Sequence, residues 1–193
     1  MPFALCSNFV WLTHPESGKI WNGFKEMITK QLNKPYRKGV NAIILDKDNN
    51  FLIIQKKIYK ENEWNFLGGG REEGETLEQN LFRELKEELD TDPDDFEIIG
   101  ISPRKTKYDY PPELASKIYG GKYRGQAFEQ VALRFVGDKK KLVFTPKEFR
   151  THKWVKASEL VNYLVFPNQY RDYKRIIDEL LPRFFNSQLN AKR

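Results

Sequence analysis

Residues 68–89, GGGREEGETLEQNLFRELKEEL, decide the fold of this chain. Three consecutive glycines predict a loop in conformations that a Cβ would forbid, after a strand over residues 64–67. Thr76 then starts a capping box, and apolar residues recur at helical spacing behind it. Pro93 cannot continue that helix, which leaves Asp90 to form its C-terminal turn.

The predicted helix carries a cluster of like charges. Glu84, Glu87 and Glu88 are three and four residues apart, so they lie within an arc of about 100° on one face. A divalent cation would offset their repulsion, because Mg²⁺ is held by carboxylates, waters and phosphates. The alternative is a solvated face neutralised by Arg83 and Lys86. The adjacent glycines let a ligand approach the backbone closely and so favour a metal platform.

Charge is divided unevenly along the 193 residues, although the formal net charge is +6. Residues 1–59 carry 9 basic and 4 acidic side chains, residues 60–100 carry 4 and 14, and residues 101–193 carry 20 and 9. Fields of opposite sign attract opposite ligands, so the basic parts suit a polyanion and the acidic part suits a cation. A solvated surface is the alternative for any single lysine.

Composition limits the class of protein. Hydrophobic residues at 39% exclude a disordered chain, and the length suits one domain. Cys6 is the only cysteine, which excludes an internal disulfide and fits a reducing compartment. No signal peptide and no run of about 18 apolar residues is found. We therefore expect a cytoplasmic globular protein with no membrane partner.

Strand and helix signals alternate through the rest of the chain. Further predicted strands cover residues 40–45, 51–55, 96–101, 130–136, 141–144 and 153–155. A polar and aromatic loop is predicted up to about Glu129, and a last helix over residues 170–181. Strands that outnumber helices, with both hairpins and intervening helices, predict an α+β sandwich with a mixed sheet.

Three parts are predicted along the chain. Residues 1–35 form an N-terminal arm, residues 36–185 the main domain and residues 186–193 a C-terminal tail. The arm is expected to be part-helical, since apolar residues recur there at helical spacing. These apolar residues are Ile20, Phe24, Met27 and Ile28.

Gly69, Glu75 and the run RELKEE at 83–88 together resemble the Nudix box, G-x5-E-x7-R-E-U-x-E-E-x-G-U, where U is a bulky apolar residue. Every charged position of that signature is filled at its spacing. Two positions depart from it: Asp90 stands in place of glycine, and Thr91 in place of an apolar residue. Aspartate tolerates the left-handed conformation at a cost of roughly 1 kcal/mol, so the turn is expected to form.

The resemblance implies a Nudix α/β/α sandwich that hydrolyses a phosphoanhydride bond. Carried over by position, Glu84, Glu87 and Glu88 would bind Mg²⁺ or Mn²⁺. Arg83 would orient the glutamates, and the Gly69 carbonyl would be a further ligand.

The resemblance leaves the catalytic base open between two carboxylates. One is Glu84. The other is Glu148 in TPKEF, which resembles the segment through which one Nudix branch brings a fourth carboxylate to the metals. As bare sequence, Glu148 reads as an ordinary surface residue.

The substrate prediction depends on residues 103–126, where lysines and arginines alternate with tyrosines. Cations hold phosphates and aromatic faces stack bases, although such a loop could also pack on its own prolines. It resembles an insertion of the branch that contains bacterial RNA 5′-pyrophosphohydrolases and asymmetric dinucleoside tetraphosphatases. The branch's late base-contacting phenylalanine has no clean match, with Phe166 the nearest aromatic. The candidate substrate contacts are Arg37, Lys107, Tyr108, Tyr110, Arg124 and Gln126.

We therefore expect a metal-dependent pyrophosphohydrolase that acts on 5′-triphosphorylated RNA. The alternatives are hydrolysis of a dinucleoside polyphosphate or another small nucleotide, and a module that binds nucleotides without cleaving them. The intact carboxylate set argues against the last. No recognition of DNA sequence is expected, and the oligomeric state is left open.

Overall fold

The computed structural model describes residues 25–26 and 29–182, without the side chains of residues 112–113. Four residues of the predicted arm helix, Ile20, Phe24, Met27 and Ile28, lie outside this range. The predicted tail, residues 186–193, lies outside it as well.

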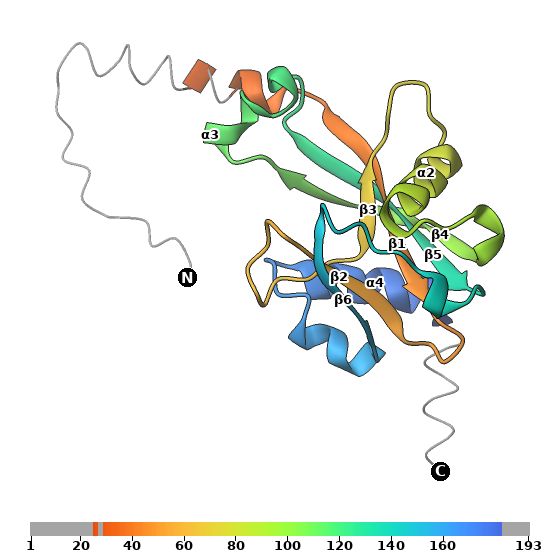
Figure 1. Cartoon of the computed structure of the whole chain (residues 1–193). Coiled ribbons are helices and arrows are strands. Elements are labelled where there is room, and N and C mark those ends of the chain that lie inside the picture. The colour runs from red at the N-terminus through yellow and green to blue at the C-terminus, as the bar shows by residue number, and fades with distance from the viewer. Residues whose placement is uncertain (1–24, 27–28, 183–193) are drawn as a thin grey trace, which may run out of the picture.

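A six-stranded mixed sheet is the centre of the fold (Figure 1). Its strands are β1 (Tyr36–Leu45), β2 (Phe51–Lys56), β3 (Leu67–Gly70), β4 (Phe96–Asp109), β5 (Gly125–Phe135) and β6 (Phe149–Val155). The strand order is β4-β5-β1-β2-β6, and β3 also pairs with β1. Only the β1–β5 pair is parallel among the strand pairs of the described chain.

Helices and helical turns lie between these strands and after the last one. They are α2 (Leu77–Leu89), η1 (Pro93–Asp95), α3 (Pro112–Ala115), η2 (Ile118–Gly121), η3 (Lys139–Lys141), η4 (Ala157–Asn162) and α4 (Gln169–Leu180). None of the helices in the described ranges is long and apolar enough to cross a bilayer.

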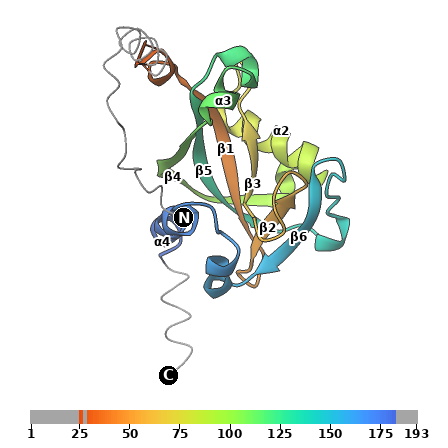
Figure 2. The same cartoon turned by 90° about the vertical axis from the view of Figure 1, so that its left-hand side faces the viewer.

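Two apolar cores lie on opposite faces of the sheet. Leu81, Leu85 and Leu89 of α2 pack on one face. Tyr173 and Ile176 of α4 belong to the core on the other face. Figure 2 shows α2 and α4 on either side of the sheet. The predicted α+β, α/β/α sandwich is confirmed.

Helix α2 has the predicted beginning and end. The Gln79 backbone N–H donates to the Thr76 hydroxyl at 3.2 Å, and the Thr76 N–H donates to the Gln79 side chain at 2.9 Å. Asp90 caps the C-terminus in the left-handed conformation, with φ 52°. The departure from glycine at this position therefore leaves the turn intact.

The prediction of a glycine loop was wrong. Residues 67–70 are strand β3, and Gly68 pairs with Asn41 of β1. A Cβ at Gly68 would overlap the backbone of β1, at Val40 and Asn41. The glycines are required by close approach within a sheet. Of the predicted strand over 64–67, only an isolated bridge at Asn65 and the first residue of β3, Leu67, are found.

Two further predictions on the C-terminal side were wrong. The long loop predicted after residue 101 is shorter than expected and is confined to residues 110–124, because β4 continues to Asp109 and β5 begins at Gly125. No strand forms over residues 141–144. Instead, the N–H groups of Val143 and Thr145 donate to the carbonyls of Leu89 and Glu88, so this segment caps α2.

The turn between β1 and β2 is organised by Asp46, which is fully buried. Its carboxylate accepts hydrogen bonds from the Asp48 and Asn50 backbone N–H groups, both at 2.8 Å, and it also pairs with Lys139. Burial raises the pKa of Asp46, but hydrogen bonds from Lys139 and Asn50 outweigh that effect and hold the pKa below its usual range.

Asp46→Asn is expected to destabilise the protein by about 2 kcal/mol at pH 7, because a buried charged hydrogen-bond partner of Lys139 is lost. Because the pKa of Asp46 is lower in the folded than in the unfolded protein, its charge stabilises the fold at pH values above the unfolded pKa. The difference in unfolding free energy between wild type and Asp46→Asn should therefore shrink below about pH 4. Urea unfolding at several pH values measures it, with the exposed Asp48→Asn as control. A difference that grows on acidification would contradict the assignment.

Candidate metal and active site

Strand β3 places Glu84 of α2 against the glycines. A Cβ on Gly69 would overlap the Glu84 carboxylate, so the absence of a side chain at this position makes room for it. Burial raises the pKa of Glu84, and the neighbouring Arg83 guanidinium opposes that shift. Gly69 and Glu84, which the resemblance names separately as metal ligands, are therefore neighbours in the structure.

Arg83 joins the acidic residues of the segment. Its Nε and Nη2 donate to the two oxygens of Glu75 at 2.6 and 3.1 Å. Its Nη1 donates to Glu84 at 2.9 Å and to Glu87 at 3.2 Å, while Nη2 also reaches the Gly70 carbonyl at 3.0 Å. The hydrogen bond from Arg83 lowers the pKa of Glu75 to about 2. Arg83 thus fixes three carboxylates relative to β3.

Glu88 is the buried member of the cluster. It is 4% exposed, and it accepts hydrogen bonds from the Gly68 N–H at 3.3 Å and from Lys56 Nζ at 3.4 Å. Burial raises the pKa of Glu88 to about 7, although the Lys56 ammonium opposes this. A second cation near this carboxylate would stabilise its charged form.

Glu148 reaches the same place from a distant part of the chain. Its carboxylate lies 3.6 Å from Lys56 Nζ, and its backbone carbonyl accepts from the Lys57 N–H at 2.8 Å. The preceding residues are fixed to the end of α2 through Thr145, whose hydroxyl donates to the Glu87 carbonyl. The structure therefore brings Glu148 and Glu88 to one cation.

Lys56 is a site residue that the sequence analysis missed. It ends β2, two residues after Ile54 and four after Leu52, which belong to the core beneath α2. Side chains alternate along a strand, so Lys56 faces the same side as those apolar residues. The sequence did contain a signal for Lys56, because the alternation of side chains along β2 places this charged residue on the side that faces the core.

The donor set fits a hard divalent cation, since four carboxylates and a glycine carbonyl are oxygen ligands. In the described part of the chain, however, no three of these carboxylates gather around one point. Each is held by Arg83 or by Lys56. Binding of an ion by several of them would require these cations to shift.

Four of the six candidate substrate contacts lie together. Tyr108 donates to the Gln126 side chain and meets Tyr110 edge to face at 5.9 Å. The Arg37 guanidinium lies against Gly70, and 4.5 Å over the ring of Tyr119. This group extends from β3 along the sheet. Arg37 lies next to β3, the same strand that contacts Glu84.

The other two candidates lie elsewhere. Lys107 neighbours Tyr108 on β4 and points to the opposite face, where it lies 5.4 Å over the Tyr36 ring. Arg124 lies 4.9 Å over the same ring. Its guanidinium donates to both Asp109 oxygens at 2.9 Å and to the Leu32 carbonyl at 2.9 Å. Arg124 would have to leave these partners to contact a phosphate.

Phe166, the nearest aromatic to the missing base contact, packs edge to face on Tyr59 at 5.3 Å. Tyr59 lies between β2 and β3, and its carbonyl accepts from Arg150 at 3.1 Å. The sequence analysis did not single out Tyr59, because its partner is more than a hundred residues away.

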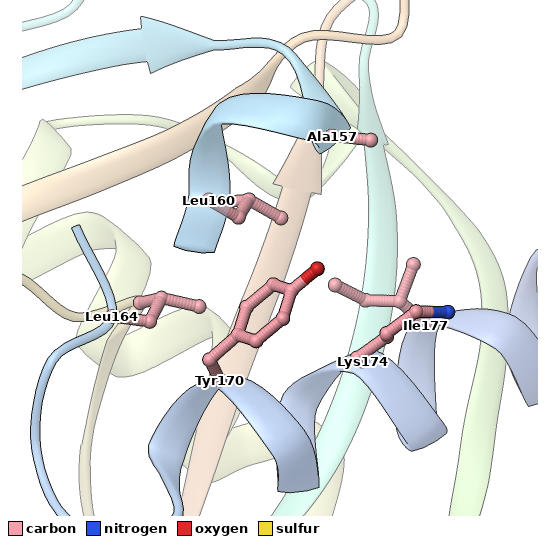
Figure 3. Close-up of a pocket in the computed structure, with 6 residues that line it drawn as sticks. All are labelled: Ala157, Leu160, Leu164, Tyr170, Lys174 and Ile177. Carbon is pink, nitrogen blue, oxygen red and sulfur yellow. The ribbon is translucent and has the colours of Figure 1, made fainter. Parts of the chain in front are cut away.

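A separate hollow lies between η4 and α4. Figure 3 shows the Tyr170 ring of α4 facing Leu160 and Leu164, with Lys174 beside Ile177 on the other side of the ring. Its lining is mostly apolar and contains no carboxylate. It also lies on the α4 side of the sheet, so it is distinct from the acidic cluster.

Comparison with known proteins identifies the family. A family model described as the NUDIX domain matches residues 35–180. An RNA pyrophosphohydrolase of Novosphingobium aromaticivorans is 32% identical over 149 residues, covering 75% of this chain and 92% of that protein.

Solved structures agree on the fold. The E. coli dihydroneopterin triphosphate pyrophosphohydrolase has a TM-score of 0.60 at 21% identity, covering 76% of this chain and 99% of that one. A C. elegans Ap4A hydrolase complex has a TM-score of 0.55 at 18% identity, covering 80% and 98%. The chain therefore belongs to the Nudix family, whose members are generally divalent-metal-dependent hydrolases of phosphoanhydrides.

Proposed function

We propose that this enzyme removes pyrophosphate or phosphate from the 5′-triphosphate end of RNA, with Mg²⁺ or Mn²⁺ held by Glu84, Glu87, Glu88 and Glu148. The observation that supports it most is the meeting of Glu148 with Glu88 at Lys56, beside the Arg83-held glutamates. It supplies the fourth carboxylate implied by the resemblance. The relative from Novosphingobium, an RNA pyrophosphohydrolase, supports the substrate.

The chain's own groups have distinct tasks in this proposal. Arg83 fixes Glu84 and Glu87, whose oxygens belong to the proposed ligand set. A bound divalent cation would offset the negative charge of the phosphates and make an attacking water more acidic. Glu148 is 52% exposed along its side chain, whereas Glu84 is fixed between Arg83 and Gly69. This difference favours Glu148 over Glu84 as the group that takes the proton of the water.

The substrate contacts belong to the same proposal. Arg37 is placed to hold a phosphate, because its guanidinium lies beside Gly70 on the strand that contacts Glu84. Tyr108, Tyr110 and Gln126 would line the path of the first nucleotide, and Tyr59 with Phe166 offers a further aromatic surface. Lys107 and Arg124 could reach only those nucleotides that lie further along the RNA, away from its 5′ end.

The location and limits of the domain complete the proposal. We propose a reducing, cytoplasmic compartment, which the single cysteine supports. We also propose that residues 36–185 form the hydrolase domain, with the arm and tail outside it. The family match to residues 35–180 supports these limits.

Salt dependence separates RNA from small nucleotides. With two or three RNA phosphates contacted, kcat/KM for a 20-nucleotide 5′-triphosphate RNA should fall about tenfold between 50 and 200 mM salt. Diadenosine tetraphosphate offers fewer contacts and should show a weaker dependence. Arg37→Gln should reduce the salt slope for RNA, whereas Lys140→Gln, which removes an exposed charge from η3, should not.

A parallel assay with labelled RNA, diadenosine tetraphosphate, ADP-ribose and nucleoside triphosphates ranks the substrates directly. A kcat/KM for diadenosine tetraphosphate far above that for RNA would overturn the RNA assignment and leave the hydrolase intact. Tight binding of nucleotides without any product would instead identify a binding module.

A further inference from the structure

Lys56 is fixed between two carboxylates that come from different parts of the fold. Its Nζ lies 3.4 Å from Glu88 Oε1 and 3.6 Å from Glu148 Oε2. Glu88 projects from α2, whereas Glu148 directly precedes β6. The side chain of Lys56 is 23% exposed, and its ammonium lies 5.7 Å from the Phe149 ring. The position is therefore partly enclosed.

The backbone holds this arrangement in register. Lys56 pairs with Phe149 across the β2–β6 ladder, at an irregularity between Gln55 and Lys56. The next residue, Lys57, donates its N–H to the Glu148 carbonyl at 2.8 Å. Lys56 and Glu148 are thus fixed as neighbours by the sheet, and the ion pair does not depend on two long surface side chains meeting.

An ammonium and a divalent ion cannot both make close contact with the same carboxylate oxygens without repelling each other. In the proposed site, Glu88 and Glu148 are ligands, so Lys56 stands where positive charge from a metal is needed. The lysine stem has four flexible carbons, which allow the ammonium to withdraw while the backbone stays in place.

We propose that Lys56 is a competing counter-cation, which neutralises Glu88 and Glu148 before a divalent ion binds and is displaced when the ion arrives. This proposal rests on the proposed metal site of Glu84, Glu87, Glu88 and Glu148. As a consequence, Lys56 weakens the affinity of the site for the metal and keeps metal binding reversible. Arg83 has a different part, because it also fixes Glu75 and the Gly70 carbonyl.

Manganese binding to the full chain, without nucleotide, tests this directly by electron paramagnetic resonance or calorimetry. Lys56→Gln is expected to lower the Mn²⁺ dissociation constant about tenfold, because it removes a positive charge within a few ångströms of the ion. Lys56→Met keeps the packing on Phe149 and must give the same result. Lys56→Arg retains the competing charge and should stay close to wild type.

Lys57→Gln is the matched control, because it removes the same charge from the adjacent, exposed residue. It should change the dissociation constant by less than about twofold, as expected for a screened charge. Mn²⁺ binding that is unchanged or weaker in the folded Lys56→Gln and Lys56→Met proteins would overturn the proposal. If the proposed metal site itself were wrong, the result would be different, because Glu87→Gln would then leave the Mn²⁺ affinity unaltered.

Discussion

Glu88→Gln is expected to lower kcat/KM on 5′-triphosphate RNA about a thousandfold, the loss typical of removing one charged group that stabilises the transition state. Glu88 is the most buried carboxylate of the cluster and is linked through Lys56 to Glu148. Glutamine keeps the shape and can still accept the hydrogen bond from Gly68. The substitution therefore removes the charge without removing the packing.

Single-turnover hydrolysis of labelled RNA at saturating Mg²⁺ measures the effect. Glu78→Gln is the control, since it makes the same chemical change on an exposed position of the same helix, and it should retain wild-type activity. Circular dichroism establishes that both variants fold. Near wild-type rates for a folded Glu88→Gln protein would exclude this carboxylate from the reaction.

The sequence predicted those features whose stabilising contacts are made by residues close together in the chain. Helix α2 has its capping box within four residues and its apolar stripe within its own length, so its bounds were readable. Glu84, Glu87 and Glu88 lie on that helix, and their shared face followed from its geometry. The Nudix box then added Arg83 and Gly69, both of which contact Glu84.

The parts that were missed depend on residues far away in the chain. Gly68–Gly70 read as a loop because the reason for glycine is the backbone of β1 and the side chains of Arg37 and Glu84. The pairing of Lys56 with Glu148 depends on the β2–β6 register, across more than ninety residues. Residues 141–144 have strand-like composition, but the Val143 N–H donates to the Leu89 carbonyl at the end of α2.

The adjacent glycines Gly68 and Gly69 should respond to alanine in opposite ways. Gly68 has φ 146°, which is unfavourable for any residue with a Cβ, and the added methyl would overlap the Val40 carbonyl and Asn41 of β1. Both obstacles are backbone, so neither relaxes easily. Gly68→Ala is expected to destabilise the protein by more than about 3 kcal/mol, measured by urea unfolding.

At Gly69 the three atoms nearest to an added methyl group all belong to the Glu84 carboxylate, the far end of a flexible side chain. Gly69→Ala should therefore change the free energy of unfolding by no more than about 1 kcal/mol. We expect its main effect on the rate of hydrolysis instead. Displacing Glu84 by about 1 Å from its bond with Arg83 should lower kcat/KM about a hundredfold, as small misplacements of catalytic groups do.

Gly100→Ala is the control for both, since its added methyl would make an ordinary contact with Leu180 at 3.4 Å, far from Glu84. It should leave stability and activity near wild type. If Gly69→Ala were fully active, the contact between this glycine and Glu84 would have no part in catalysis. If Gly68→Ala lost activity but not stability, β3 would be free to shift, and the rigidity of the Gly68–Glu88 contact would be refuted.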